Sequence, residues 1–252
     1  MKYLNTQAGK QKGLSIVELM VALVLSLVVL LVTTSIYVSN KQTYRFLDQY
    51  SMLQENGRFA IFFLREHILQ AGFPRQAGVD PFPTLPTNNT VPASDSIIVQ
   101  FRSAVDCLND VPAGALPLKL TQNTFQINAN SLQCNGNGLV GGVDQPAQVL
   151  VEGIESLQAV YGVDTDADGI ANTYADSAQV EGGIITAGTP DWDNVVSMRV
   201  AVLVQGQPNI LDTAQAFTYN LLGQDYTPSA DRTPRRVFTT TIPLRNRNRT
   251  II

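Results

Sequence analysis

The sequence has few side chains that could do chemistry, and the densest group of them is an acidic run beyond its midpoint. Asp164, Asp166 and Asp168 alternate along the chain and are followed by a glycine, and Ile170 and Asn172 continue the spacing. Alternating carboxylates followed by a main-chain carbonyl and a side-chain amide supply the oxygen ligands that Ca²⁺ takes in protein loops. We therefore predict a candidate calcium loop at these five residues, with a merely solvated acidic turn as the alternative.

This acidic run does not match an EF-hand. The last ligand position of an EF-hand loop is glutamate, but here Ala175 holds that position and the next acid, Asp176, comes one place late. The flanking residues also have the pattern of a strand and a loop rather than of two helices. Calcium is the only cofactor that the sequence suggests.

Groups for catalysis are otherwise sparse. The chain has one histidine, His67, which we place on a helix surface, so a Ser-His-Asp site would have to recruit it from there. Neither a glycine-rich phosphate loop nor a nucleophile elbow occurs in the sequence. We predict that the protein is not an enzyme.

The composition excludes several other classes of protein. Only 15% of the 252 residues are charged, against about 25% in an average soluble domain. The net charge of −4 is too small for a disordered polyanion or a general nucleic-acid-binding polycation. Six arginines follow the last acid, Asp231: Arg232, Arg235, Arg236, Arg245, Arg247 and Arg249. We interpret them as part of an exposed sheet face that also meets acidic neighbours, and we expect no nucleic-acid binding.

Residues 14–40 form an apolar stretch long enough to span a membrane. As a helix they would reach about 40 Å, against about 30 Å for the hydrocarbon core of a bilayer. Three lysines and no acid lie in residues 1–13, so the positive-inside rule places this leader in the cytoplasm and the chain after Asn40 outside. We expect a retained helix, because residues 33–35 match the cleavage site of a secretory signal poorly.

Glu18 is the only Asp, Glu, Lys, Arg or His of this stretch. A carboxylate at mid-bilayer costs about 2.5–3.5 kcal/mol on insertion scales, so a compensating group is expected. If the chain is cut after Gly13, the new α-amino group of Leu14 lies one helical turn before Glu18 and carries the opposite charge. In a packed array of such helices, the carboxylate would meet the amine of a neighbour. A protonated or snorkelling glutamate is the alternative.

Cys107 and Cys134 lie outside the membrane in this topology, with 26 residues between them. Because that compartment is oxidising, we predict a disulfide between them. Redox catalysis is disfavoured, since the sequence has no Cys-X-X-Cys spacing.

The residues from Lys12 to Met20, KGLSIVELM, resemble the processing site of type IV prepilins. The resemblance implies that a prepilin peptidase cuts after Gly13, that Leu14 becomes the methylated N-terminus and that Glu18 is the assembly carboxylate. Two features differ from the usual pattern of the family. The first mature residue is leucine where phenylalanine is common, and the leader of thirteen residues is long.

Residues 41–73 continue the helix with an amphipathic pattern. Small, apolar or aromatic residues recur every three or four positions: Phe46, Tyr50, Leu53, Gly57, Ala60, Leu64, Ile68 and Ala71. A glycine and then a proline after Ala71 stop the helix, so one helix is predicted from Leu14 to Ala71. The run from Gln54 to Ala60, and Tyr161 to Asp164 further on, resemble the same regions of minor pilins of the PilW family.

Residues 74–252 are predicted to form a β-rich head. After a proline-rich connection at 74–95, β-branched and apolar runs are separated by turn residues. The predicted strands are 97–102, 118–121, 124–127, 149–151, 157–163, 195–204 and 236–244. We predict an α+β fold, with the long N-terminal helix packed on a mostly antiparallel sheet. This agrees with the pilin fold that the resemblance implies.

The resemblance implies a minor pilin, held in the inner membrane by one span with its head in the periplasm and later placed at the pilus tip on the cell surface. Its implied partners are prepilin peptidase, other minor pilins, the major pilin, the inner-membrane assembly machinery and a tip adhesin. A type II secretion pseudopilin shares the N-terminus and the fold, and is the nearest alternative. A calcium-dependent adhesive or ligand-binding head is the alternative from another class.

Overall fold

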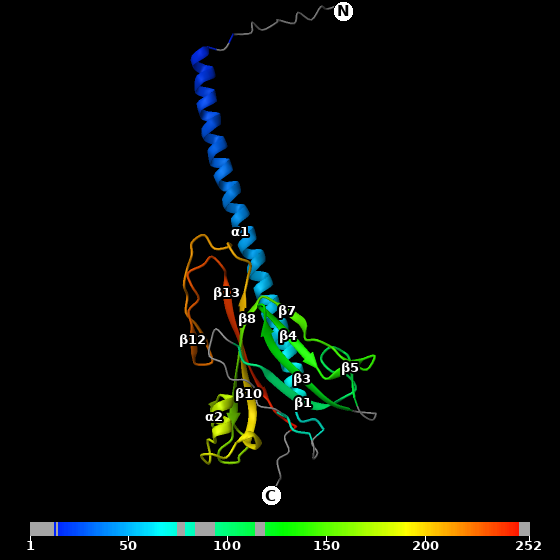
Figure 1. Cartoon of the computed structure of the whole chain (residues 1–252). Coiled ribbons are helices and arrows are strands. Elements are labelled where there is room, and N and C mark those ends of the chain that lie inside the picture. Colours follow the sequence, from blue (N-terminus) through cyan, green and yellow to red (C-terminus); the bar gives the residue numbers. More distant parts are fainter. Residues whose placement is uncertain (1–12, 14, 75–78, 84–93, 114–118, 247–252) are drawn as a thin grey trace, which may run out of the picture. The chain divides into compact units, whose positions relative to one another are not determined.

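The computed structural model describes residues 13, 15–74, 79–83, 94–113 and 119–246. The chain divides into two compact units, Met1–Leu47 and Asp48–Ile252. Helix α1, Ile16–Gln70, runs through both of them (Figure 1). The predicted leader is described only at Gly13, and Leu14 lies outside the described residues, so the processing of the chain stays a prediction.

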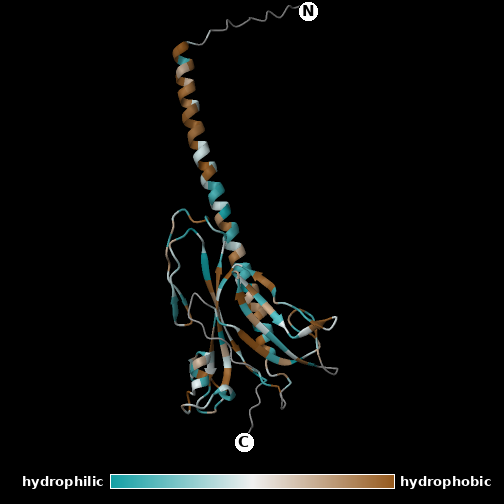
Figure 2. Cartoon of the chain, in the orientation of Figure 1, coloured by the Kyte–Doolittle hydropathy of each residue, from teal (hydrophilic) through white to brown (hydrophobic). Residues whose placement is uncertain are grey.

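The described part of the first unit is mainly the apolar portion of α1. Its side chains from Ile16 to Leu47 are all exposed, and its first half is strongly hydrophobic (Figure 2). Five hydroxyls donate to carbonyls of the same helix, and three of them are Ser26 to Leu23 (2.9 Å), Thr33 to Val29 (2.6 Å) and Thr34 to Leu30 (2.8 Å). These groups are satisfied within the helix, as a lipid environment requires. Among the described residues, α1 is the one helix long and apolar enough to cross a membrane.

In the second unit, α1 packs through one stripe of small and apolar side chains. Its buried residues recur every three or four positions: Gln49, Leu53, Gly57, Ala60, Leu64 and Ile68. The predicted stripe is confirmed from Leu53 onwards but was wrong at its start, because Phe46 and Tyr50 are 40% and 38% exposed. Gln49 is buried instead, and its amide oxygen accepts a hydrogen bond from the main chain of Gln207 (3.1 Å). A hydropathy pattern does not indicate a buried amide of this kind.

The helix ends at Gln70, one residue before its predicted end. Gly72 follows with φ +78°, a conformation that favours glycine. Its N–H donates to the carbonyl of Gln100 in the first strand (2.8 Å). The predicted stop signal therefore turns the chain from the helix towards the sheet.

Two four-stranded antiparallel sheets form most of the head (Figure 1). The first has the order β1-β3-β4-β7, with β1 Ile97–Ser103, β3 Lys119–Asn128, β4 Ser131–Gly136 and β7 Gln148–Glu152. The second has the order β13-β10-β8-β9, with β13 Arg235–Pro243, β10 Val195–Gln205, β8 Ile154–Val163 and β9 Thr173–Ala175. The smaller elements are β2 Val111–Pro112, β5 Gly138–Val140, β6 Val143–Asp144, α2 Ser177–Gly182, the 3-10 turn η1 Trp192–Asn194, β11 Tyr219–Leu221 and β12 Gln224–Tyr226. The predicted α+β fold, a long helix on mostly antiparallel sheets, is confirmed.

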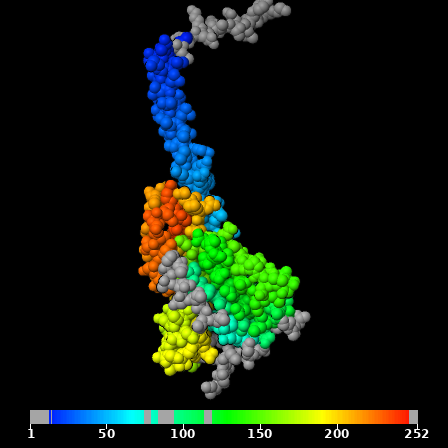
Figure 3. Space-filling view, viewed as in Figure 1, coloured from blue at the N-terminus to red at the C-terminus, as the bar shows by residue number. Residues whose placement is uncertain are grey.

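The main core joins the helix to both sheets. A single cluster of buried side chains includes Leu64 of α1, Phe125 of β3 and Leu157 of β8. A second, smaller cluster lies under the β11–β12 hairpin, where Leu203 of β10 contacts Leu221. Strand β10 is therefore covered on both faces, which explains its nearly uninterrupted apolar sequence. Figure 3 shows the segment from β11 to β13 as the orange face of the head.

Several predicted strand limits were wrong. The predicted runs 118–121 and 124–127 are one strand, β3, from Lys119 onwards, because Asn123 between them is buried and paired with β1 through Val99, and residue 118 lies outside the described residues. The sequence did not predict the short helix α2, the 3-10 turn η1 or the strands β2, β4, β5, β6, β9, β11 and β12. These elements are short or rich in polar residues, and their existence depends on partners that are distant in the sequence.

Gly57 is required for the close approach of α1 and β13, and this gives the first prediction. A Cβ atom at Gly57 would overlap the ring of Phe238. Gly57→Val should therefore lower the free energy of unfolding by about 1–3 kcal/mol through overpacking. The matched control is Gly182→Val, because nothing lies within 4 Å of a Cβ atom there. Thermal unfolding of the full chain in detergent measures both, and equal midpoints for the two variants would contradict the packing described.

Candidate functional site

The predicted assembly residues lie where the helix begins. Ser15 precedes α1, and its hydroxyl accepts from the N–H of Val17 (3.3 Å), as an N-cap residue does. Glu18 lies in the first turn of the helix, where a carboxylate is favoured by the helix dipole. Gly13 is exposed and has nothing within 4 Å of its Cβ position. The amine of Leu14, the expected partner of Glu18, is outside the described residues.

The predicted calcium loop is the connection between β8 and β9, so its flanks are strands and not the helices of an EF-hand. Asp164 is 1% exposed. Its two carboxylate oxygens accept from the N–H groups of Ala167 (2.7 Å) and Gly169 (2.8 Å). Both of these residues have positive φ angles, 68° and 93°. Asp164 thus holds the loop in a tight turn.

The carboxylates of Asp166 and Asp168 also accept hydrogen bonds from groups of this loop. Asp168 accepts from the N–H of Ile170 (2.7 Å), and Asp166 accepts from the side-chain amide of Asn172 (3.2 Å). One oxygen each from Asp164, Asp166 and Asp168 lies within 4.8 Å of the others. Ligands of one Ca²⁺ ion lie about 2.3–2.6 Å from it, and hence up to about 5 Å from each other. The three carboxylates therefore fit one hard cation.

The two other predicted ligands, Asn172 and Ile170, were expected to contribute an amide oxygen and a main-chain carbonyl. The amide oxygen of Asn172 accepts from the N–H of Thr165 (2.7 Å), so a main-chain donor already engages it. The side chain of Ile170 is 67% exposed. Asp176, just beyond the loop, caps α2 by accepting from the N–H of Gln179 (2.8 Å). The structure thus brings the three aspartates together and gives Asn172 a role in shaping the loop.

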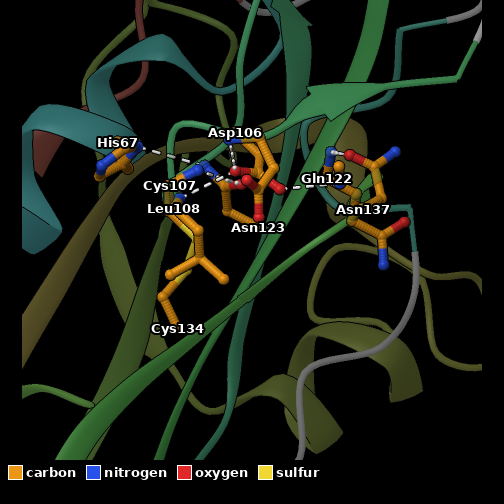
Figure 4. The surroundings of a disulfide bond; sticks show 10 residues. His67, Asp106, Cys107, Leu108, Gln122, Asn123, Cys134 and Asn137 are labelled. Atoms are coloured by element: carbon orange, nitrogen blue, oxygen red, sulfur yellow. Dashed lines mark hydrogen bonds between the residues drawn. A yellow bond between two sulfur atoms is a disulfide. The ribbon is translucent and has the colours of Figure 1, made fainter. Parts of the chain in front are cut away.

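The two cysteines form the predicted disulfide, with their Cα atoms 6.5 Å apart (Figure 4). Cys134 lies in β4 and is fully buried, whereas Cys107 lies in the turn after β1. Asp106 holds this turn by accepting from the main-chain N–H groups of Leu108 (2.8 Å) and Gly138 (2.7 Å). The disulfide therefore fixes a turn that is already ordered by hydrogen bonds.

His67 is not the surface residue that the sequence predicted. It is half-buried and its ring packs at a tilt against Phe63, with ring centroids 4.6 Å apart, and lies 5.5 Å from Phe125. Its Nδ1 atom is 3.2 Å from the amide nitrogen of Asn123, whose oxygen accepts from the N–H of Cys107 (3.1 Å). Because that amide nitrogen can only donate, Nδ1 accepts, and the ring is neutral with its proton on Nε2. No local sequence signal indicates this contact.

This arrangement predicts that the stability of the head depends on pH. Burial lowers the pKa of His67 below its usual 6.5, although Glu66 and Asp106 oppose the shift. The unfolded chain then binds a proton more readily than the folded one, so stability should be complete above about pH 6.5 and fall below it, by up to about 1.4 kcal/mol per pH unit. His67→Gln should flatten this dependence in urea unfolding measured between pH 8 and pH 5. A parallel pH profile in the variant would refute it.

One of the C-terminal arginines meets acids as predicted, although its side chain is largely buried and not exposed, and Arg247 and Arg249 lie outside the described residues. The side chain of Arg235 is 7% exposed and pairs with Glu155 (2.6 Å) and Asp231 (2.7 Å). This arginine lowers the pKa of Asp231. The pairs join β13 to β8 and to the preceding loop, so Arg235 has a structural role.

The fold and these sites define a class of protein. A membrane-length apolar helix with an acid in its first turn continues as the packing helix of a disulfide-bonded α+β head. These are the features of a membrane-anchored, pilin-like subunit.

Comparison with known families identifies the subunit more closely. The family described as "Prokaryotic N-terminal methylation motif" matches residues 9–34. The family described as "Type IV Pilus-assembly protein W", or PilW, matches residues 120–246, half of the chain. The chain therefore belongs to the PilW family. It is a minor pilin that takes part in type IV pilus assembly. This family is structural rather than enzymatic.

The chain is also similar to solved structures. The "Type IV-like pilin TTHA1219 from Thermus thermophilus" matches with 14% sequence identity and a TM-score of 0.48. The match covers 78% of this chain and 98% of that one. No curated protein matches the chain.

Proposed function

We propose that this protein acts in the tip complex of a type IV pilus, where it joins other minor pilins, primes polymerisation of the major pilin and helps to present a tip adhesin. The observation that carries the proposal is the presence of two signals in one chain. The methylation motif covers the start of the anchor and the PilW match covers most of the head.

The proposed sequence of events uses the chain's own groups. Prepilin peptidase removes residues 1–13, and the freed amine of Leu14 becomes methylated. The helix stays in the inner membrane with the head in the periplasm until the assembly machinery extracts it. Glu18 then pairs with the amine of an adjacent helix, which favours stacking over dispersal in lipid.

Deletion of the gene tests the proposal against its alternatives. Loss of piliation with normal exoprotein secretion supports a role in pilus assembly. Normal pili with lost exoprotein secretion would instead identify a type II secretion pseudopilin. Normal pili with lost adhesion would favour a calcium-dependent adhesive or ligand-binding head.

We also propose that the β8–β9 loop binds Ca²⁺, because three carboxylate oxygens converge within 4.8 Å. Extracellular modules of this chemistry bind with Kd values of about 0.1–1 mM. Ca²⁺ at about one hundred times its Kd should add about 2.7 kcal/mol to the stability, which raises the melting temperature of a head this size by about 5–10 °C.

The calcium prediction is measured by thermal unfolding and by calorimetric titration of the full chain in detergent. Replacing both Asp166 and Asp168 by alanine should abolish the binding heat and the thermal shift. Asp164 is kept because it orders the loop backbone. Asp193→Ala removes an exposed acid elsewhere and serves as the control. An equal thermal shift in the double variant, or no binding heat in the unaltered protein, would refute the site.

A further inference from the structure

A groove runs along the outer flank of α1, beside β13. Its volume is about 790 Å³, and all of its lining belongs to the second unit. The helix contributes Phe59 and Phe62 to its apolar surface, and β13 contributes Phe238. Phe59 and Phe62 are 47% and 57% exposed. Neighbouring large aromatic side chains that remain this exposed are typical of a surface that binds a partner.

The strand that borders the groove has a free edge. In the second sheet β13 pairs with β10 and is the last strand, so its other edge has no strand partner in the described chain. Natural edge strands are usually protected by charged residues, prolines or bulges. From Val237 to Ile242 this strand has neither a charge nor a proline, and three threonines lie in it. Arg235 and Arg236 at its start and Pro243 at its end protect the ends of the strand, so its central part, 237–242, is the edge that can pair with another extended chain.

The charges around the groove indicate the chemistry of that chain. Arg58 and Arg65 lie on the same flank of α1, and both line the groove together with a single acid, Glu55. Within the described residues, neither arginine is in an ion pair. Arg236 stands nearby, with its guanidinium over the rings of Tyr50 and Phe238. The excess of positive charge selects a partner that carries carboxylates.

We propose that this groove docks an extended, acidic segment of another protein subunit, which pairs with the edge of β13 and places an apolar side chain between Phe59 and Phe62. The proposal rests on the proposed function, in which the head joins other subunits. An extended segment is favoured over a helix because the edge offers main-chain hydrogen bonds, while the aromatic side chains give a pocket for alternate residues.

Photocrosslinking in living cells tests the proposal with the full chain. Phe62→p-benzoylphenylalanine and Thr239→p-benzoylphenylalanine place a probe on each side of the groove, and Phe217→p-benzoylphenylalanine is the control, since Phe217 is 55% exposed and is not part of the groove. Both groove probes should capture the same segment of one other protein, and its crosslinked peptide should contain acidic residues. Capture of a second copy of this chain, of lipid, or of the same products as the control would overturn the proposal.

A charge test separates recognition from mere proximity. The double variant Arg58→Glu, Arg65→Glu should reduce the yield of the Phe62 crosslink by about tenfold or more, whereas Arg58→Lys, Arg65→Lys should largely keep it. Changing the acids of the captured segment to lysine should restore the yield in the Glu variant. Abundance of the processed chain and of its disulfide checks that each variant folds. An unchanged yield in a folded Glu variant would overturn the proposal.

The docking proposal and the proposed function can be refuted separately. If deletion abolishes pili but the groove probes capture no acidic segment, the docking proposal is refuted and the assembly role stands. If deletion leaves pili intact while the groove probes still capture an acidic segment, docking stands and the assembly role fails.

Discussion

Glu18→Ala should leave the protein inserted in the membrane but reduce piliation by at least about tenfold. Loss of a carboxylate from an apolar helix makes insertion easier, since the charge costs about 2.5–3.5 kcal/mol at mid-bilayer. Assembly should suffer, because removing one partner of a desolvated ion pair leaves the other charge uncompensated, at a cost of about 3–5 kcal/mol. The helix itself should persist, because Ser15 caps it independently of Glu18.

Two further variants make this experiment specific. Glu18→Gln keeps the size and polarity but removes the charge, so it should fail like the alanine variant. Ser26→Ala removes a hydroxyl that donates to the carbonyl of Leu23 in the same helix, and should support normal piliation. Pili are counted by electron microscopy, and insertion is measured by fractionation. Normal pili in Glu18→Gln would show that the carboxylate charge has no part in assembly.

Removing the disulfide should have the largest effect on the stability of the head. Closing a loop of this length contributes about 3–4 kcal/mol in the chain-entropy model. The variant with Cys107→Ser and Cys134→Ala should therefore melt about 6–16 °C lower, at about 2–4 °C per kcal/mol for a head of this size. Because Asp106 still orders the turn through main-chain hydrogen bonds, the variant should fold to the same structure at low temperature.

Trp192 reports this unfolding, since it is the only tryptophan and packs on Tyr161 with ring centroids 4.9 Å apart. Its fluorescence is followed during heating of the full chain in detergent. Reduction of the unaltered protein should reproduce the lower midpoint. A midpoint within about 2 °C of the unaltered protein would show that the disulfide contributes little.

The features that could be predicted from the sequence are local ones. The apolar helix, its stop after Ala71 and the acidic loop each depend on residues within a short stretch, so spacing alone indicates them. The loop illustrates the limit of this reasoning. The alternation of Asp164, Asp166 and Asp168 predicts a shared centre, but the clamp of Asp164 on the N–H groups of Ala167 and Gly169 appears only in the folded turn.

The features that could not be predicted depend on contacts between distant residues. Asn123 is polar, and so it separated two predicted strands, yet it is buried because Cys107 and His67 satisfy its amide. We expected His67 on the helix surface, but its ring contacts Asn123 and lies in an aromatic cluster. Likewise, β4 is rich in polar residues and becomes a strand only because β3 and β7 pair with it on either side.

Immunogold electron microscopy of intact pili is the most direct test of the central claim, that this PilW-family protein acts at the pilus tip. An antibody against the head should label the ends of pili in cells that carry the unaltered gene, and should label nothing in the deletion strain. Label distributed along the shaft, or pili of normal number and length without any label, would contradict the account.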